Sequence, residues 1–116
     1  MSIERRLSQR IPFIEPIKYG LDHHPTFTGY TFDISESGIG IKASKVFPPE
    51  SEILVDMYIG DEVIRAEGLV VRVTPILSGE ASIMGVKISG RTDRVKHIYM
   101  QRLTEPHHLD KTTEYD

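Results

Sequence analysis

The stretch YTFDISESGIGI, residues 30–41, decides the fold. Tyr30, Phe32 and Ile34 alternate with polar residues, and this period of two is typical of a half-buried strand. Residues 35–38 supply serine and glycine for a turn, after which isoleucines alternate again with other residues. The stretch therefore predicts two strands joined by a tight turn, with Tyr30, Phe32 and Ile34 on the apolar face.

Similar alternation occurs on both sides of this stretch. Further strand segments are expected at 16–21, 53–59, 63–73 and 84–88. Within 63–73 the phase of the pattern changes at Gly68, which predicts a bulge or bend there. Short strands at this spacing, in so small a chain, favour a closed sheet without exposed edges. We therefore predict a mainly all-β fold, a six-stranded antiparallel β-barrel followed by one C-terminal α-helix.

The helix is expected at about residues 92–103. Thr92 is a good N-cap, and Val95, Ile98 and Tyr99 follow at the spacing of one helix face. We expect this apolar face to close an open end of the barrel or to dock on a partner. The predicted domain organisation is a flexible arginine-rich arm (1–12), the barrel with its closing helix (13–104) and a disordered tail (105–116).

Composition limits the classes of function. The 116 residues carry a net charge of −3 and include no cysteine. Binding of DNA or RNA is not expected, because a sequence-independent binder needs a large basic face. The missing thiols exclude disulfides and thiolate chemistry, and no apolar run is long enough for a transmembrane helix. We expect a cytoplasmic protein, a monomer or weak dimer, that does not insert into membranes.

Positive charge is concentrated at the start of the chain, at Arg5, Arg6 and Arg10. Arg6 and Arg10 are four residues apart, so their guanidinium groups face one direction on a helix or on an extended chain. A planar guanidinium can grip phosphate with two hydrogen bonds, pair with guanine O6 and N7, or stack on a base. Taken alone, such a pair is more often a solvated terminus.

A second polar group ends the strand that contains Tyr30. Asp33 and Ser35 share one face by the period of two, and Gly38 follows three residues later. A carboxylate beside a hydroxyl can accept hydrogen bonds from N1–H and N2–H₂ of guanine. Gly38 permits a turn conformation or the close approach of a ring. Taken alone, the segment is more often a polar turn that closes a hairpin.

Together, the two groups resemble the PilZ domain family. Arg6 and Arg10 match its first motif, Arg-x-x-x-Arg, near the start of the chain. Asp33, Ser35 and Gly38 match its second motif, Asp-x-Ser-x-x-Gly, at a strand end. The resemblance implies a receptor for cyclic di-GMP, a bacterial second messenger. It also implies that the arginines hold phosphates and guanine while the second motif reads a guanine edge.

The resemblance extends to Arg5, which is similar to the residue found in family members that take up a stacked pair of ligand molecules. We expect the ligand to order the arm against the barrel, because charge-assisted contacts outweigh the cost of ordering. The ordered arm would then form a surface for an unidentified effector protein. The expected ligand-binding residues are Arg5, Arg6, Arg10, Asp33, Ser35 and Gly38. No cofactor or metal is expected.

Other classes of function remain open. The chain could be a protein-interaction domain of the same fold without significant nucleotide binding. A binder of single-stranded nucleic acid would need exposed aromatic residues beside a basic groove, and the sequence shows neither clearly. We do not expect an enzyme, because no nucleophile or acid/base pair is placed for catalysis, and adjacent loop histidines seldom hold one metal ion.

Overall fold

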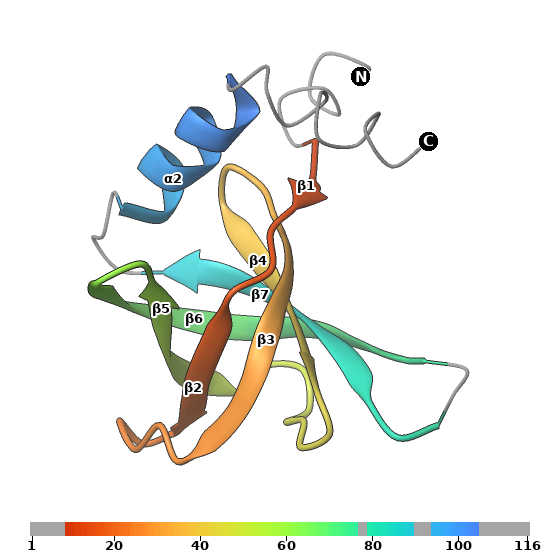
Figure 1. Cartoon of the computed structure of the whole chain (residues 1–116). Helices are drawn as coiled ribbons and strands as arrows, with labels where there is room; N and C mark the ends of the chain where they lie inside the picture. Colours follow the sequence, from red (N-terminus) through yellow and green to blue (C-terminus); the bar gives the residue numbers. More distant parts are fainter. Residues whose placement is uncertain (1–8, 77–78, 90–93, 105–116) are drawn as a thin grey trace.

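The computed structural model describes residues 9–76, 79–89 and 94–104. These residues form antiparallel strands and one helix (Figure 1). The elements are β1 (Ile11–Pro12), β2 (Pro16–Leu21), β3 (Phe27–Ile34), β4 (Gly38–Ala43), β5 (Glu52–Ile59), β6 (Glu62–Pro75), β7 (Ser82–Ser89) and α2 (Arg94–Leu103). Thr92, Arg5, Arg6 and the tail at 105–116 lie outside the described ranges.

Six of the strands close into a barrel. In the order β3, β2, β5, β6, β7, β4, each strand pairs with the next, and a further pairing of β3 with β4 completes the ring. The pairings within the described ranges are all antiparallel. β1 adds two residues to the end of β3, outside the ring. The predicted six-stranded antiparallel barrel with one C-terminal helix is thereby confirmed.

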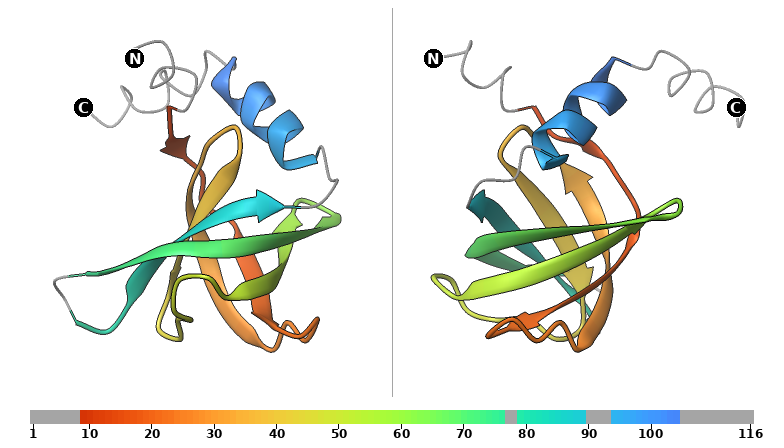
Figure 2. Two further views of the ribbon diagram at one scale, coloured as in Figure 1. Left: turned by 180° about the vertical axis from the view of Figure 1, so that it is seen from behind. Right: turned by 90° about the vertical axis from the view of Figure 1, so that its left-hand side faces the viewer.

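The core fills the barrel with side chains from its six strands and continues under the helix. Its largest fully buried members include Tyr19, Phe13, Ile17, Ile34, Ile39, Ile41, Met57 and Met84. α2 adds Val95, Ile98 and Tyr99, the apolar face that the spacing predicts. The helix lies at the end of the barrel where β1 and the β3–β4 turn are found (Figure 2). In the described ranges, no helix is long and apolar enough to cross a membrane.

The predicted orientation of β3 is wrong for two residues. Tyr30 and Phe32 are 56 % and 44 % exposed, whereas Thr31 between them is 1 % exposed. The register of β3 with β4 shifts between Thr31 and Asp33, and this bulge returns Ile34 to the core. The alternation in the sequence runs through the bulge without a break, so it predicts that Tyr30, Phe32 and Ile34 share one face. In the structure Tyr30 and Phe32 face outward, whereas Ile34 faces the core.

The bulge expected at Gly68 lies elsewhere in β6. Gly68 pairs in regular register with the strands on both sides, whereas the register with β7 shifts between Val70 and Arg72. Val70 is buried and Val71 is exposed. The error has a simple cause, because the consecutive apolar residues 69–71 carry no period from which the shift could be read.

Candidate functional site

β1 attaches the start of the described chain to the end of β3. Ile11 pairs with Ile34, and Pro12 pairs with Asp33. Beyond β1 the chain stays beside β3, where the N–H of Phe13 donates to a carbonyl of that strand at 3.2 Å. This pairing places residue 10 next to the polar end of β3.

Thr31 holds the segment that follows β1. Its hydroxyl donates to the carbonyl of Phe13 (2.5 Å) and accepts from the N–H of Glu15 (2.7 Å). Buried backbone groups need such partners, which explains why a threonine replaces an apolar residue on the inner face of β3. The segment at 11–15 is therefore fixed by backbone pairing and by one buried hydroxyl.

Arg10 bridges two residues of the predicted site. Its Nη2 lies 2.9 Å from Asp33 Oδ1, and its Nη1 donates to Ser35 Oγ at 3.3 Å. The pairing of Pro12 with Asp33 explains these contacts, because it aligns the preceding residues with the strand end. The side chains of Arg10 and Asp33 are 35 % and 22 % exposed, so the ion pair lies near the surface.

The carboxylate of Asp33 retains hydrogen-bonding capacity. Asp33 Oδ1 is a buried atom within ion-pair distance of Arg10, but it accepts no well-aligned hydrogen bond from the described residues. A buried oxygen without a hydrogen bond carries a desolvation cost of about 1–3 kcal/mol. The positive charge of Arg10, 2.9 Å away, offsets part of this cost.

Ser35 and Gly38 close the turn between β3 and β4. The N–H of Ser35 donates to the carbonyl of Gly38 at 2.9 Å, and the Ser35 hydroxyl lies 3.4 Å from the same oxygen. A Cβ on Gly38 would lie 2.5 Å from the carbonyl oxygen of Val86. Gly38 is therefore required by the close approach of β7, since its φ is not positive.

Gly40 is a residue of this region that the sequence prediction missed. It pairs with Asp33, and a Cβ at this position would lie 2.5 Å from Asp33 Oδ1. Any side chain here would displace the carboxylate. The signal is present in the sequence, because the outward positions of β4 beside Asp33 are glycines while Ile39 and Ile41 point inward.

α2 supports the site from the end of the barrel. The Tyr99 hydroxyl donates to the carbonyl of Gln9 at 2.7 Å, one residue before Arg10. Burial raises the pKa of Tyr99, and the charge of Glu36 adds to this shift. Lys96 Nζ lies 3.6 Å from a carboxylate oxygen of Glu36, which follows Ser35. The helix thus contacts both the segment that carries Arg10 and the turn that carries Ser35.

A second helix contact reaches the same segment. Arg102 Nη2 donates to Glu15 Oε2 at 3.2 Å, and its guanidinium lies 4.9 Å from the centre of the Phe13 ring. A cation over an aromatic face is attracted to it. α2 therefore holds the chain on both sides of β1.

The structure brings Arg10, Asp33 and Ser35 together and places Gly38 at the other end of the same turn. Arg5 and Arg6 lie outside the described residues. The binding role of these six residues stays a prediction.

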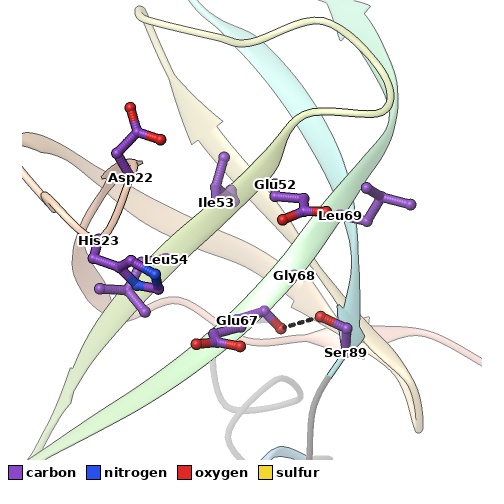
Figure 3. A pocket seen from close by; sticks show the side chains of 9 residues that line it. All are labelled: Asp22, His23, Glu52, Ile53, Leu54, Glu67, Gly68, Leu69 and Ser89. Atoms are coloured by element: carbon purple, nitrogen blue, oxygen red, sulfur yellow. Dashed lines mark hydrogen bonds between the residues drawn. The ribbon is translucent and has the colours of Figure 1, made fainter.

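A separate pocket of about 630 Å³ is formed by the turn after β2 with β5, β6 and β7 (Figure 3). Its lining includes the carboxylates of Asp22, Glu52 and Glu67 and the apolar side chains of Leu54 and Leu69. Three carboxylates repel an anion. This pocket is therefore unsuited to the phosphate ligand that the arginines indicate.

These features define a class of protein. A closed barrel presents a guanidinium, a carboxylate and a hydroxyl side by side at the end of one strand. Convergent polar groups of this kind orient a small ligand. The molecule is a small β-barrel domain with a candidate ligand site at one strand end.

The chain belongs to the PilZ domain family, whose model matches residues 4–105. This match confirms the family that the two motifs indicate. A search of curated protein sequences found no match to the chain.

Several solved structures share the fold. The PilZ domain with c-di-GMP of YcgR from Escherichia coli has a TM-score of 0.66 and 12 % identity, over 97 % of this chain and 98 % of that one. The Bacillus subtilis inhibitor of motility MotI/DgrA also has a TM-score of 0.66, with 14 % identity over 85 % of this chain. The match covers 51 % of the Bacillus protein, so this chain corresponds to about half of its length.

A third similar structure is the PilZ domain of CeSA from a cellulose-synthesizing bacterium. It has a TM-score of 0.53 and 20 % identity, over 83 % of this chain and 94 % of that one. At these identities the likeness establishes the fold.

Proposed function

We propose that this chain is a cyclic di-GMP receptor and adaptor domain that acts in the bacterial cytoplasm and is not an enzyme. The observation that carries the proposal is the contact of Arg10 with Asp33 and Ser35. These three residues occupy matching positions of both PilZ motifs. Membership of the family and the likeness to the YcgR domain with c-di-GMP support the choice of ligand.

Each polar group has a role that suits its chemistry. The Arg10 guanidinium grips a phosphate of the ligand or a guanine. The Asp33 carboxylate accepts from guanine N1–H and N2–H₂. The Ser35 hydroxyl bonds a further polar atom, and Gly38 keeps the turn beneath the ligand close to β7. Arg5 and Arg6 supply further cationic contacts from the arm.

The ion pair between Arg10 and Asp33 is weak enough to exchange with a ligand. A partly exposed pair such as Arg10–Asp33 contributes about 0–1 kcal/mol. A hydrogen bond between a guanidinium and a phosphate contributes about 1.5–3 kcal/mol. When the ligand supplies a phosphate and a guanine together, Arg10 can therefore exchange Asp33 for the phosphate, or contact both, at little cost.

The same contacts suggest how the signal is passed on. Ligand binding to Arg5 and Arg6 would order the arm against the barrel at the expense of about 2–5 kcal/mol. α2 contacts Gln9 of the arm and Glu36 of the turn, so the helix would sense the change. The ordered arm with α2 would form a new surface for an effector protein.

Calorimetric titration with cyclic di-GMP tests the proposal. We expect saturable heat from the wild type and its loss in Arg10→Ala and Asp33→Ala. Lys18→Ala is the matched control, because Lys18 is an exposed cation of β2 on the barrel wall. It should bind like the wild type.

A wild type that gives no heat at any ligand concentration would contradict the proposal. The chain would then be a protein-interaction domain that kept the fold without the ligand. Heat retained in both the Arg10 and Asp33 variants would instead show that the ligand binds at another place.

A further inference from the structure

The wall of the barrel formed by β2 and β3 carries exposed apolar side chains. On β3, Tyr30 and Phe32 are 56 % and 44 % exposed, and Ile14, in the segment before β2, is 68 % exposed. The residues on both sides of Ile14 form backbone hydrogen bonds with β3, so Ile14 lies beside that strand. We define the β2–β3 face as Ile14, Pro16, Lys18, Tyr30, Phe32 and Lys42.

Strand pairing gathers these side chains on the outer surface. Tyr30 pairs with the exposed Pro16 of β2 on one side and with the exposed Lys42 of β4 on the other. Residues paired directly across a sheet share one face. Phe32 faces outward at the bulge and directly precedes Asp33, so the apolar surface continues to the proposed ligand site.

Two lysines supply the charge of the β2–β3 face. Lys42 pairs with Tyr30, and the exposed Lys18 pairs with Thr28, two residues earlier in β3. Neither lysine forms an ion pair or a hydrogen bond with the residues that the structure describes. Asp56 pairs with Lys18 across the sheet, but its carboxylate already accepts two hydrogen bonds from an arginine of β6. Both lysines can therefore bind an anion from outside.

We infer that the β2–β3 face is a docking surface for an acidic amphipathic helix of an effector protein. This inference rests on the proposed function for the role of adaptor and names the class of effector. Apolar side chains of the helix pack on Tyr30, Phe32 and Ile14, while its carboxylates bind Lys18 and Lys42. The two lysine positions are about 12 Å apart by strand geometry, close to the rise of about 10 Å between residues i and i+7 of a helix.

Two other occupants suit the face less well. Anionic membranes recruit proteins through clusters of about four to eight basic residues, whereas the face offers Lys18 and Lys42 alone. A second copy docked symmetrically by the same face would bring these lysines against their equivalents, and like charges repel. An acidic helix meets neither difficulty.

Titration of the whole chain with two synthetic peptides tests the inference. Both peptides are amphipathic helices of about 18 residues with one leucine stripe, and their polar positions are glutamate in one and lysine in the other. We expect the glutamate peptide to shift the NMR signals of the Ile14 methyl groups and of the Tyr30 and Phe32 amides until they saturate. The lysine peptide should leave these signals in place.

Substitutions on the face locate the contact. Tyr30→Ser should bind the glutamate peptide about tenfold more weakly, because an aromatic anchor commonly contributes such a factor. Lys42→Glu should also weaken binding, whereas Lys87→Glu, at an exposed lysine of β7 outside the face, is the matched control and should bind like the wild type. The double variant Lys18→Glu with Lys42→Glu should bind the lysine peptide instead. Thermal unfolding of each variant should stay close to that of the wild type, since these side chains are exposed.

Unchanged signals at millimolar glutamate peptide would overturn the inference, and so would equal binding of both peptides. Binding to vesicles of phosphatidylcholine with about one quarter phosphatidylglycerol, without binding of the peptide, would assign the face to a membrane. Shifts that follow protein concentration alone would assign it to a second copy.

Calorimetry with cyclic di-GMP separates this inference from the proposed function. If the wild type binds cyclic di-GMP but not the glutamate peptide, the docking surface is wrong and the receptor stands. If the peptide binds at the β2–β3 face and cyclic di-GMP gives no heat, the receptor is wrong and the face belongs to a protein-interaction domain.

Discussion

Arg10 Nη2 lies 2.9 Å from Asp33 Oδ1, so the residue just before β1 is held against the end of strand β3. The two residues are 23 positions apart in the sequence and meet in this contact. The contact exists because β1 pairs with the end of β3 and because α2 holds Gln9 and Glu15 from the other side. These contacts of the strands and the helix therefore bring the central residues of the proposed site together.

Removal of the Arg10 side chain should change stability little. In Arg10→Ala the free energy of unfolding should fall by less than about 1 kcal/mol, because a partly exposed ion pair contributes little. Urea unfolding beside the Lys18→Ala control measures the difference. A loss of several kcal/mol would show that Arg10 is held by the fold and is not available for exchange with a ligand.

Thr31→Val should destabilise the protein through the segment after β1. The change leaves the carbonyl of Phe13 and the N–H of Glu15 without the buried hydroxyl, at a cost of about 1–3 kcal/mol. Thr28→Val, at an exposed position of the same strand, is the matched control. Equal unfolding midpoints in urea for the two variants would contradict this role of Thr31.

Gly38→Ala should destabilise the junction of β4 with β7. The new Cβ would lie 2.5 Å from the carbonyl oxygen of Val86, so the strands must move apart at a cost of about 1–3 kcal/mol. Gly85→Ala makes only ordinary contacts and should be neutral or slightly stabilising. Thermal unfolding of the two alanine variants tests the difference, and an unchanged Tm in Gly38→Ala would refute the close approach.

Stability should fall at alkaline pH through Tyr99. Burial, with a smaller contribution from the charge of Glu36, raises the pKa of Tyr99 above the value of about 10 for an unfolded chain. Its contribution is present in full below about pH 10 and is lost as the pH rises through the higher pKa of the folded state. Unfolding measured from neutral pH to above pH 10 should show a shallower decline in Tyr99→Phe than in the wild type.

Some alkaline dependence should remain in Tyr99→Phe, because burial also raises the pKa of Tyr19. An identical decline in the variant and the wild type would show that Tyr99 does not titrate with unfolding. The variant also removes the hydrogen bond to Gln9, so amide hydrogen exchange at residues 9–11 should become faster at neutral pH.

The sequence was sufficient for the barrel where apolar alternation is unbroken. Ile53, Val55 and Met57 face the core as the period of two predicts. The sequence was insufficient at the bulges in β3 and β6. There an extra residue exchanges the inward and outward positions of the strand without changing its composition. Tyr30 and Phe32 are outside the barrel for this reason.

The residue types of the candidate site could be predicted, but not all of its geometry. Arg10, Asp33 and Ser35 have side chains that suit a nucleotide, and the structure places them together. The glycines of β4 indicate an outward face without side chains, but the contact of Gly40 with Asp33 depends on the pairing of β3 with β4, which no local pattern specifies.

An NMR titration of the whole chain with cyclic di-GMP tests the central claim most directly. Backbone amide signals of residues 9–11 and 33–38 should shift together and saturate, while those of the acidic pocket around Glu52 and Glu67 should stay in place. Signals at 9–11 and 33–38 that remain unchanged at millimolar ligand would contradict a binding site built from Arg10, Asp33 and Ser35.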